Sequence, residues 1–420
     1  MFVQQEIRRP VSAPTMANAR ASASISAPAA LAASAALAAP AGPTASTPAS
    51  APAFADELFR RLPRADQRRW AQAYVQALLV TPGKKTMRRL AASVSDSPTA
   101  SQALHQFVNA SPWLWSEVRE DLIWQVSRYE RPRAWTVAPV VLPKRGTKSC
   151  GVHRRFAPER GRSVSCQLAL GAFLSTAAGE IPVDWSLHLP GPWLDDPVLR
   201  SRARIPESVT ARSVAAGVLS LVDNLTVRSP QRPLPVVADI AGHGDPGELV
   251  HGLSARGREF VVAVPASLPL VPDGPPRGPR RTEPVPVPAL HAERLLRTQG
   301  KAAGGGRLGS AWVRLAGERT ADPRPYRLFT DPRPGPGTPR GGQLWITNMV
   351  HRPTEDLLRL IGAQTATAET LHSLTDDFGL YDFEGRSFPG WHHHMTLVSG
   401  AFAYRALMTD HARSPALRSA

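Results

Sequence analysis

The chain has few cysteines, few lysines and no long apolar run, and each scarcity excludes a class of protein. Cys150 and Cys166 are the only cysteines. They form neither a disulfide framework nor the spacing of a zinc site, which fits a reducing compartment. No stretch approaches the roughly 18 consecutive apolar residues of a membrane-spanning helix. We therefore expect a cytoplasmic protein without a membrane partner.

Positive charge is abundant, but nearly all of it is arginine. The 420 residues include 50 Lys and Arg against 34 Asp and Glu, a formal net charge of +16. Such an excess favours a polyanionic partner such as DNA, RNA or an acidic membrane surface. A composition rich in Arg, Ala and Pro is also what a GC-rich genome produces, so the charge alone does not decide the partner. The length suits two or three domains.

The amino-terminal part divides into a tail and a helical region. Residues 1–53, rich in Ala, Ser and Pro, are expected to be a disordered tail. Residues 54–131 show helical spacing, with Trp70, Tyr74 and Leu78 on one face of a helix that ends at Pro82. Ser111 and Pro112 are expected to cap and begin the last helix of this region.

The helical region carries a dense set of basic side chains that we predict contact DNA phosphates. The alternative is an ordinary solvated surface of a helical domain. The predicted DNA-binding residues, with Lys144 added from the next segment, are Arg60, Arg61, Arg64, Arg68, Arg69, Lys84, Lys85, Arg88, Arg89 and Lys144.

After Arg131 the pattern changes from helical to alternating. Strands are expected at 135–142, 164–170 and 181–187, the second and third antiparallel to the first. A helix, an apolar run that ends in Asp239, a second helix and a fifth strand follow, which is the order of a ribonuclease-H-like fold. We therefore predict a mixed α/β protein with a five-stranded mixed sheet. The expected segments are 132–265 and 344–408 for this core, 266–343 for a Pro/Arg/Gly-rich insertion and 409–420 for a tail.

Seven stretches, spread through most of the chain, resemble one family in order. They are Trp135–Val152, Ser165–Ala169, Ile181–Pro190, Val237–Asp245, Phe260–Pro265, Gly379–Ser387 and Gly390–Leu397. From about Leu58 to Arg405 the chain resembles the transposases of insertion-sequence family seven-oh-one, which belong to the DDE superfamily. The resemblance implies phosphodiester cleavage and strand transfer on the inverted-repeat ends of a double-stranded DNA element. It also implies a homo-oligomer on DNA, and thus a nucleoid-associated protein when bound.

The implied chemistry uses two Mg²⁺ or Mn²⁺ ions held by three carboxylates. The resemblance assigns the second acidic position to Asp239. The first falls on Ala138 or Pro139 and the third on Ala368, so both acids are lost. Glu369 is a candidate substitute, although one helical step turns a side chain by roughly 100°. Glu384 is the other candidate, from a family position that suggests a supporting role.

These losses leave three hypotheses. The first, which we favour, is a transposase-like protein that binds DNA but is catalytically impaired. The second is a DNA-binding regulator or repressor of transposition, and the third is an active transposase with non-standard ligands. For Asp239 the alternative to metal binding is a cap on the turn into Ala241 and Gly242, with no metal bound. His392, His393 and His394 are expected to be structural, and Gly304–Gly306 a flexible turn.

Overall fold

A mixed β-sheet with helices on both faces forms the protein. The computed structural model describes residues 50–157, 161–229, 233–272, 287–289, 297–301, 307–316, 325–331 and 342–417. Its α/β, ribonuclease-H-like architecture confirms the predicted fold class. Residues 1–49, Gly304–Gly306, which were expected to form a turn, and 332–341 lie outside this description. Within the described residues, no helix has the length and apolar character needed to cross a membrane.

The amino-terminal helices begin earlier than predicted. They are α1 (Ala51–Leu58), α2 (Ala65–Val80), α3 (Met87–Ala92), α4 (Ala100–Asn109) and α5 (Trp115–Tyr129). Helix α1 starts inside the segment expected to be a tail, and the Ser50 hydroxyl caps it by accepting a hydrogen bond from the Ala53 amide at 3.3 Å. Gly83, with φ +62°, permits the turn that follows α2.

The predicted start of the last of these helices was wrong. Ser111 and Pro112 precede α5, which begins only at Trp115. The Ser111 hydroxyl accepts a hydrogen bond from the Gln67 amide at 2.8 Å instead of capping a helix. Trp113 is buried and stacks on Phe107, with ring centroids 5.6 Å apart. Packing against α2 and α4 therefore outweighs the local capping preference.

The strands of the predicted core occur in the expected order. They are β1 (Ala134–Pro143), β3 (Arg162–Thr176), β4 (Gly179–His188), β5 (Val236–Ala238) and β6 (Phe260–Val264). Strand β1 lies between β3, which is antiparallel to it, and β5, which is parallel. Strand β4 pairs antiparallel with β3 and therefore runs parallel to β1, so its predicted antiparallel direction was wrong. The tight turn between β3 and β4 explains this reversal.

The described sheet is wider than the predicted five strands. β2 (His153–Ala157) pairs with the first residues of β3. β12 (Gln343–Thr347) pairs with β6, and β11 (Tyr326–Asp331) and β10 (Arg307–Leu315) continue beyond it. β7 (Pro269–Pro272), β8 (Val287–Pro288) and β9 (Arg297–Lys301) complete this side. The described parts of segment 266–343 thus extend the sheet.

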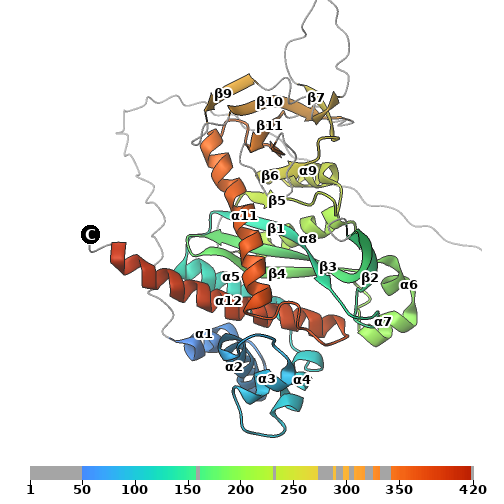
Figure 1. The fold of residues 1–420 in the computed structure, drawn as a ribbon, viewed down its shortest axis with the longest axis vertical. Coiled ribbons are helices and arrows are strands. Elements are labelled where there is room, and N and C mark those ends of the chain that lie inside the picture. The colour runs from blue at the N-terminus through green and yellow to red at the C-terminus, as the bar shows by residue number, and fades with distance from the viewer. Residues whose placement is uncertain are drawn as a thin grey trace, which may run out of the picture. The chain divides into compact units, whose positions relative to one another are not determined.

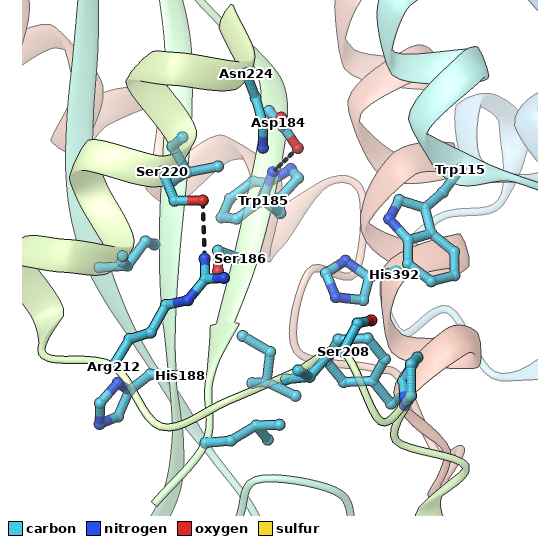
Figure 2. A pocket seen from close by; sticks show the side chains of 18 of the residues that line it. Trp115, Asp184, Trp185, Ser186, His188, Ser208, Arg212, Ser220, Asn224 and His392 are labelled. Carbon is cyan, nitrogen blue, oxygen red and sulfur yellow. Dashed lines mark hydrogen bonds between the residues drawn. The ribbon is translucent and has the colours of Figure 1, made fainter. Parts of the chain in front are cut away.

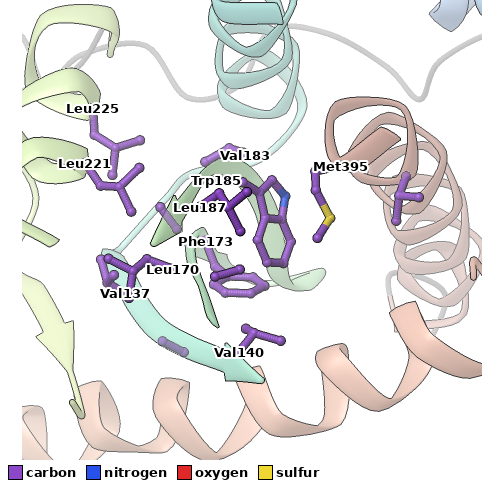
Figure 3. Packing of buried hydrophobic residues seen from close by; sticks show 14 of the residues in the cluster. Val137, Val140, Leu170, Phe173, Val183, Trp185, Leu187, Leu221, Leu225 and Met395 are labelled. Carbon is purple, nitrogen blue, oxygen red and sulfur yellow. The ribbon is translucent and has the colours of Figure 1, made fainter. Parts of the chain in front are cut away.

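Helices cover both faces of the sheet (Figure 1). After the short helices α6 (Gly191–Asp195) and α7 (Pro197–Ala203), α8 (Val214–Arg228) and α9 (Pro246–Ala255) pack on one face. Helices α11 (Thr354–Asp376) and α12 (Phe388–Leu417) cover the other, and α12 extends into the segment expected to be a tail. Figure 3 shows Leu221 of α8 and Met395 of α12 in the same buried cluster as Trp185 of β4.

One buried arginine ties the helical region to the sheet. Arg119 of α5 is 2% exposed, and its guanidinium donates to the Asp184 carboxylate of β4 at 2.7 Å. The same group donates to the Thr396 hydroxyl at 2.8 Å and the His392 carbonyl at 3.1 Å, both on α12. Because isolated buried charge is costly, this network fixes α5, β4 and α12 together.

Glu180, at the start of β4, is expected to make the free energy of unfolding depend on pH. Its side chain is buried, and burial raises its pKa from 4.5 to about 7. Between about pH 4.5 and 7 the folded protein therefore holds a proton that the unfolded chain has released, so stability falls as pH rises through this window. Glu180→Gln should remove that loss and raise the free energy of unfolding at pH 8 by about 1–3 kcal/mol.

Urea unfolding of both proteins at pH 5 and pH 8 checks this expectation. Glu369→Gln is the control, because Glu369 lines the same cavity as Glu180 but is exposed. An unchanged pH dependence in Glu180→Gln would contradict the assignment.

Candidate active site beside β1 at the carboxyl end of β5

Ala138 and Asp239 occupy adjacent positions on neighbouring parallel strands. The last paired residues of β1 and β5 are Val137 and Ala238, and Ala138 and Asp239 follow them directly. Val237 packs in a buried cluster with Leu357 of α11. Because side chains alternate along a strand, Ala138 and Asp239 lie on this same α11 face. The carboxyl ends of parallel strands are where α/β folds place their chemistry.

The Asp239 carboxylate already caps a turn. Its Oδ1 accepts a hydrogen bond from the Ala241 amide at 3.0 Å, and Gly242 continues the turn with φ +71°. Burial raises the pKa of Asp239, and the Ala241 hydrogen bond opposes that shift. The second oxygen makes no hydrogen bond to a described residue. Asp239 is thus half-buried with one oxygen engaged by its own turn.

The neighbouring position contributes no ligand. Ala138 is 4% exposed, and its partner across the sheet in β3 is Gly171. Pro139, the other residue matched to the first acid, is half-buried on the following position of β1. A methyl group therefore lies beside Asp239 where a carboxylate would be needed.

Glu369 lies toward the other end of the strands. Ala368 and Glu369 are both exposed on α11. Glu369 lines a cavity of about 330 Å³ with Glu180 of β4. Ser175 of β3 pairs with Ala134 of β1 on one side and with Glu180 of β4 on the other, so Glu180 lies at the height of Ala134 in the sheet. Ala134 is about 13 Å along β1 from Ala138. The structure therefore does not bring Glu369 together with Asp239.

Glu384 lies beyond the carboxyl end of β1, near Lys144. The Lys144 ammonium donates to the Phe383 carbonyl at 3.1 Å, which holds the loop after α11 against the end of β1. Burial lowers the pKa of Lys144 to about 8, and the Asp382 and Glu384 carboxylates oppose the shift. Lys144 is six residues past Ala138, roughly 20 Å along an extended chain. Glu384 is therefore grouped with Lys144, and not with Asp239.

The donor set does not fit a pair of divalent ions. Mg²⁺ and Mn²⁺ require several hard oxygen ligands, and a two-metal site shares carboxylates between both ions. Among the described residues, no group of three or more His, Cys, Asp or Glu side chains could hold a metal. Of the described carboxylates, only Asp239 lies beside Ala138, so these residues do not fit a two-metal centre.

The comparison with known families agrees with this scaffold. The family described as DDE superfamily endonuclease matches residues 57–303, more than half of the chain. The protein belongs to the DDE superfamily. No curated protein matches the chain. The matched region contains Ala138 and Asp239 but ends before α11, so the late helix that carries Ala368 lies outside it.

The three consecutive histidines of this DDE protein have separate structural partners. His393 lies between the Val108 and Trp113 carbonyls, at 2.8 and 2.9 Å. His394 contacts the Tyr74 hydroxyl at 3.2 Å, and His392 stacks on the Trp115 ring. Burial lowers the pKa of all three, so they are neutral at pH 7. Their contacts agree with the structural role expected from the sequence.

The predicted DNA-binding side chains of the DDE protein differ in their availability. Lys85 is buried, and its ammonium donates to the Leu78 carbonyl at 2.9 Å and to the Thr81 carbonyl. Arg61 is bound by Glu120 and Asp121. Other members of the set are already paired or packed: Arg60 with Asp121, Arg64 with Asp66, Arg68 with the Leu62 carbonyl, Arg69 over Trp70 and Arg89 with the Pro82 carbonyl.

Two exposed cations of the set have no such partner. Lys84 and Arg88 make no ion pair with a described residue and lie at the turn between α2 and α3 and in α3 itself. They are therefore the members of the predicted set that the structure leaves most available to an anion.

Sequence reasoning did not single out the buried pair of Arg119 and Asp184. Only one of the two residues gave a signal. Arg119 follows Val118 on the buried side of α5, where a charged residue is unusual. Asp184 stands at a polar position of the alternation between Val183 and Trp185, and it is buried because β4 is covered on both faces.

Proposed function

We propose that this protein is a DNA-binding, transposase-like member of the DDE superfamily whose phosphodiester cleavage is impaired. We further propose that it derives from insertion-sequence family seven-oh-one. The observation that carries the proposal is the methyl group of Ala138 beside Asp239. A two-metal site needs carboxylates at both positions, and neither Glu369 nor Glu384 supplies the missing one.

The retained scaffold supports DNA binding as the remaining activity. The proposed partner is double-stranded DNA, at the inverted-repeat ends of an element, with several copies of the chain assembled there. In the cell such a protein would be nucleoid-associated. Lys84 and Arg88 are the side chains that we propose contact phosphates, because they are exposed and carry no ion pair to a described residue.

Salt dependence of DNA affinity tests this surface. For a duplex, the logarithm of the binding constant falls with the logarithm of salt concentration by about 0.9 for each phosphate neutralised. Lys84→Ala/Arg88→Ala should weaken binding and make this slope shallower by about 2. Fluorescence anisotropy of a labelled duplex across a salt series measures both quantities.

Arg61→Ala/Arg64→Ala is the matched control. It removes the same two charges, but both guanidiniums are held by carboxylates in the folded protein. Its slope should change by clearly less than that of the first variant. Equal changes would show that net charge alone matters and would contradict the proposed surface. No duplex binding even at low salt would contradict the DNA-binding function.

A regulator or repressor of transposition would share the same scaffold and would also lack a carboxylate at position 138. Inhibition of an active element by this chain, at its own DNA ends, would distinguish this role from that of a remnant. An active transposase would need other carboxylates as ligands next to Asp239. Glu369 and Glu384 both lie far from Asp239, which disfavours this hypothesis.

A further inference from the structure

A cavity of about 460 Å³ lies beside β4, away from Asp239. Its walls are β4, helix α8, the loop that precedes α8, and the first turns of α5 and α12 (Figure 2). Leu170 and Leu221 form its apolar floor. Ala138 and Asp239 lie on the α11 face of the sheet. Side chains alternate along a strand, so Pro139 and its cross-strand partner Leu170 lie on the opposite face, which α8 covers. The cavity is therefore separate from the candidate active site.

The lining of this cavity carries an excess of positive charge. Asp184 is shared by two guanidiniums, from Arg119 at 2.7 Å and Arg228 at 3.1 Å. Arg212 is exposed, donates to the Ser220 hydroxyl at 2.9 Å and makes no ion pair with a described residue. The lining thus holds three arginines and one carboxylate. Even with Glu248, which accepts a hydrogen bond from Ser213 at the rim, the balance stays positive.

Arg119 and Arg228, which share Asp184, differ in how many of their guanidinium nitrogens already make hydrogen bonds. All three nitrogens of the Arg119 guanidinium are engaged with Asp184, α12 and the Trp185 carbonyl. Arg228 binds Asp184 through one nitrogen, and its others make no hydrogen bond to a described residue. Arg212 and Arg228 are therefore the groups available to an anion. A guanidinium suits the oxygens of a phosphate, and Arg212, which makes no ion pair with a described residue, is the freer of the two.

The opposite wall is aromatic, and hydroxyl and amide groups lie between. Trp115 stacks on His392, with ring centroids 4.6 Å apart and planes 6° from parallel. Ser186 and Asn224 belong to the same lining, and Figure 2 shows Arg212 on the side across from Trp115. Burial lowers the pKa of His392 well below 6.5, so it adds no charge at neutral pH. The cavity volume is in the range of small-molecule sites, roughly 300–1,000 Å³.

We propose that this cavity binds one nucleotide unit, with its phosphate at Arg212 and its sugar and base toward Asn224 and the stacked rings of Trp115 and His392. The unit is either a free nucleoside monophosphate or one nucleotide of a DNA strand, since both present the same phosphate, sugar and ring. Flat aromatic surfaces accept any base, and guanidiniums accept the phosphate. The proposal does not depend on metal binding at Asp239 or on duplex binding at α3.

Isothermal titration calorimetry of the full chain tests the proposal with three probes: deoxyadenosine monophosphate, inorganic phosphate and a short single-stranded oligonucleotide. Arg212→Gln should weaken nucleotide binding by about tenfold or more, because a charge-assisted hydrogen bond is lost. Arg256→Gln is the matched control. Arg256 is on the turn after α9, pairs with Asp223 and does not line the cavity. Asn224→Ala should reduce the preference for the nucleotide over phosphate.

Each outcome decides a part of the proposal. Saturable binding of the monophosphate identifies a free nucleotide as ligand, and binding of the oligonucleotide alone identifies a DNA strand. Inorganic phosphate that binds as tightly as the monophosphate would overturn the assignment of a nucleotide. Absence of binding to all three probes, or equal binding by Arg212→Gln and the unaltered protein, would overturn the site itself.

Discussion

Asp184→Asn is expected to lower the free energy of unfolding by about 3–5 kcal/mol. The substitution keeps the size of the side chain but removes the charge that faces Arg119, which is 2% exposed. A buried guanidinium without its counter-ion costs far more than a lost surface contact, because water cannot replace the partner. Arg119 also joins α5 to α12 through Thr396, so the loss should loosen the helical region from the sheet.

Urea unfolding measures this effect, with Asp223→Asn as the control. Asp223 also forms an ion pair with an arginine, Arg256, at 2.9 Å, but its side chain is 48% exposed. Exposed pairs are screened by water and contribute about 0–1 kcal/mol. Equal destabilisation by the two substitutions would show that the network around Arg119 does not hold the fold together as described.

Ala138→Asp is expected to create a site for divalent ions that the natural sequence lacks. It would place a second carboxylate beside Asp239, on strands about 4.8 Å apart. Without metal, two like charges at a buried and a half-buried position repel, so the melting temperature should fall. Mg²⁺ or Mn²⁺ should restore it by binding the folded state, whereas the melting temperature of the unaltered protein should not respond to these ions.

Ala138→Asn separates the effect of charge from that of size. Asn has nearly the volume of Asp, so both substitutions crowd the position next to Gly171 of β3 equally. Only the Asp variant should respond to metal in differential scanning fluorimetry. A folded Ala138→Asp protein with no response to Mg²⁺ or Mn²⁺ would mean that position 138 does not face Asp239.

The central strands and Asp239 could be predicted because their signal is local. The apolar run that becomes β5 ends at a charged residue, as buried parallel strands do, and the turn after it contains Gly242. Hydrophobic alternation likewise indicated β3 and β4. These patterns place Asp239 at the carboxyl end of a central strand without knowledge of any contact.

Other features depend on contacts between distant segments and could not be predicted. Lys85 and Lys84 are adjacent in sequence, yet one is buried against the end of α2 and the other is exposed. The strands beyond β6 lie within or just after the Pro/Arg/Gly-rich segment, and β12 pairs with β6 although the two are far apart in the chain, which a local pattern does not reveal. The distance of Glu369 and Glu384 from Asp239 follows from strand direction and loop packing, which spacing along the chain does not reveal.

Cleavage and strand transfer on the element's own DNA ends, in Mg²⁺ and in Mn²⁺, test the central claim most directly. The unaltered protein should bind these ends but yield no more product than Asp239→Ala, because the position beside Asp239 holds a methyl group. Metal-dependent product from the unaltered protein that disappears in Asp239→Ala would contradict the account.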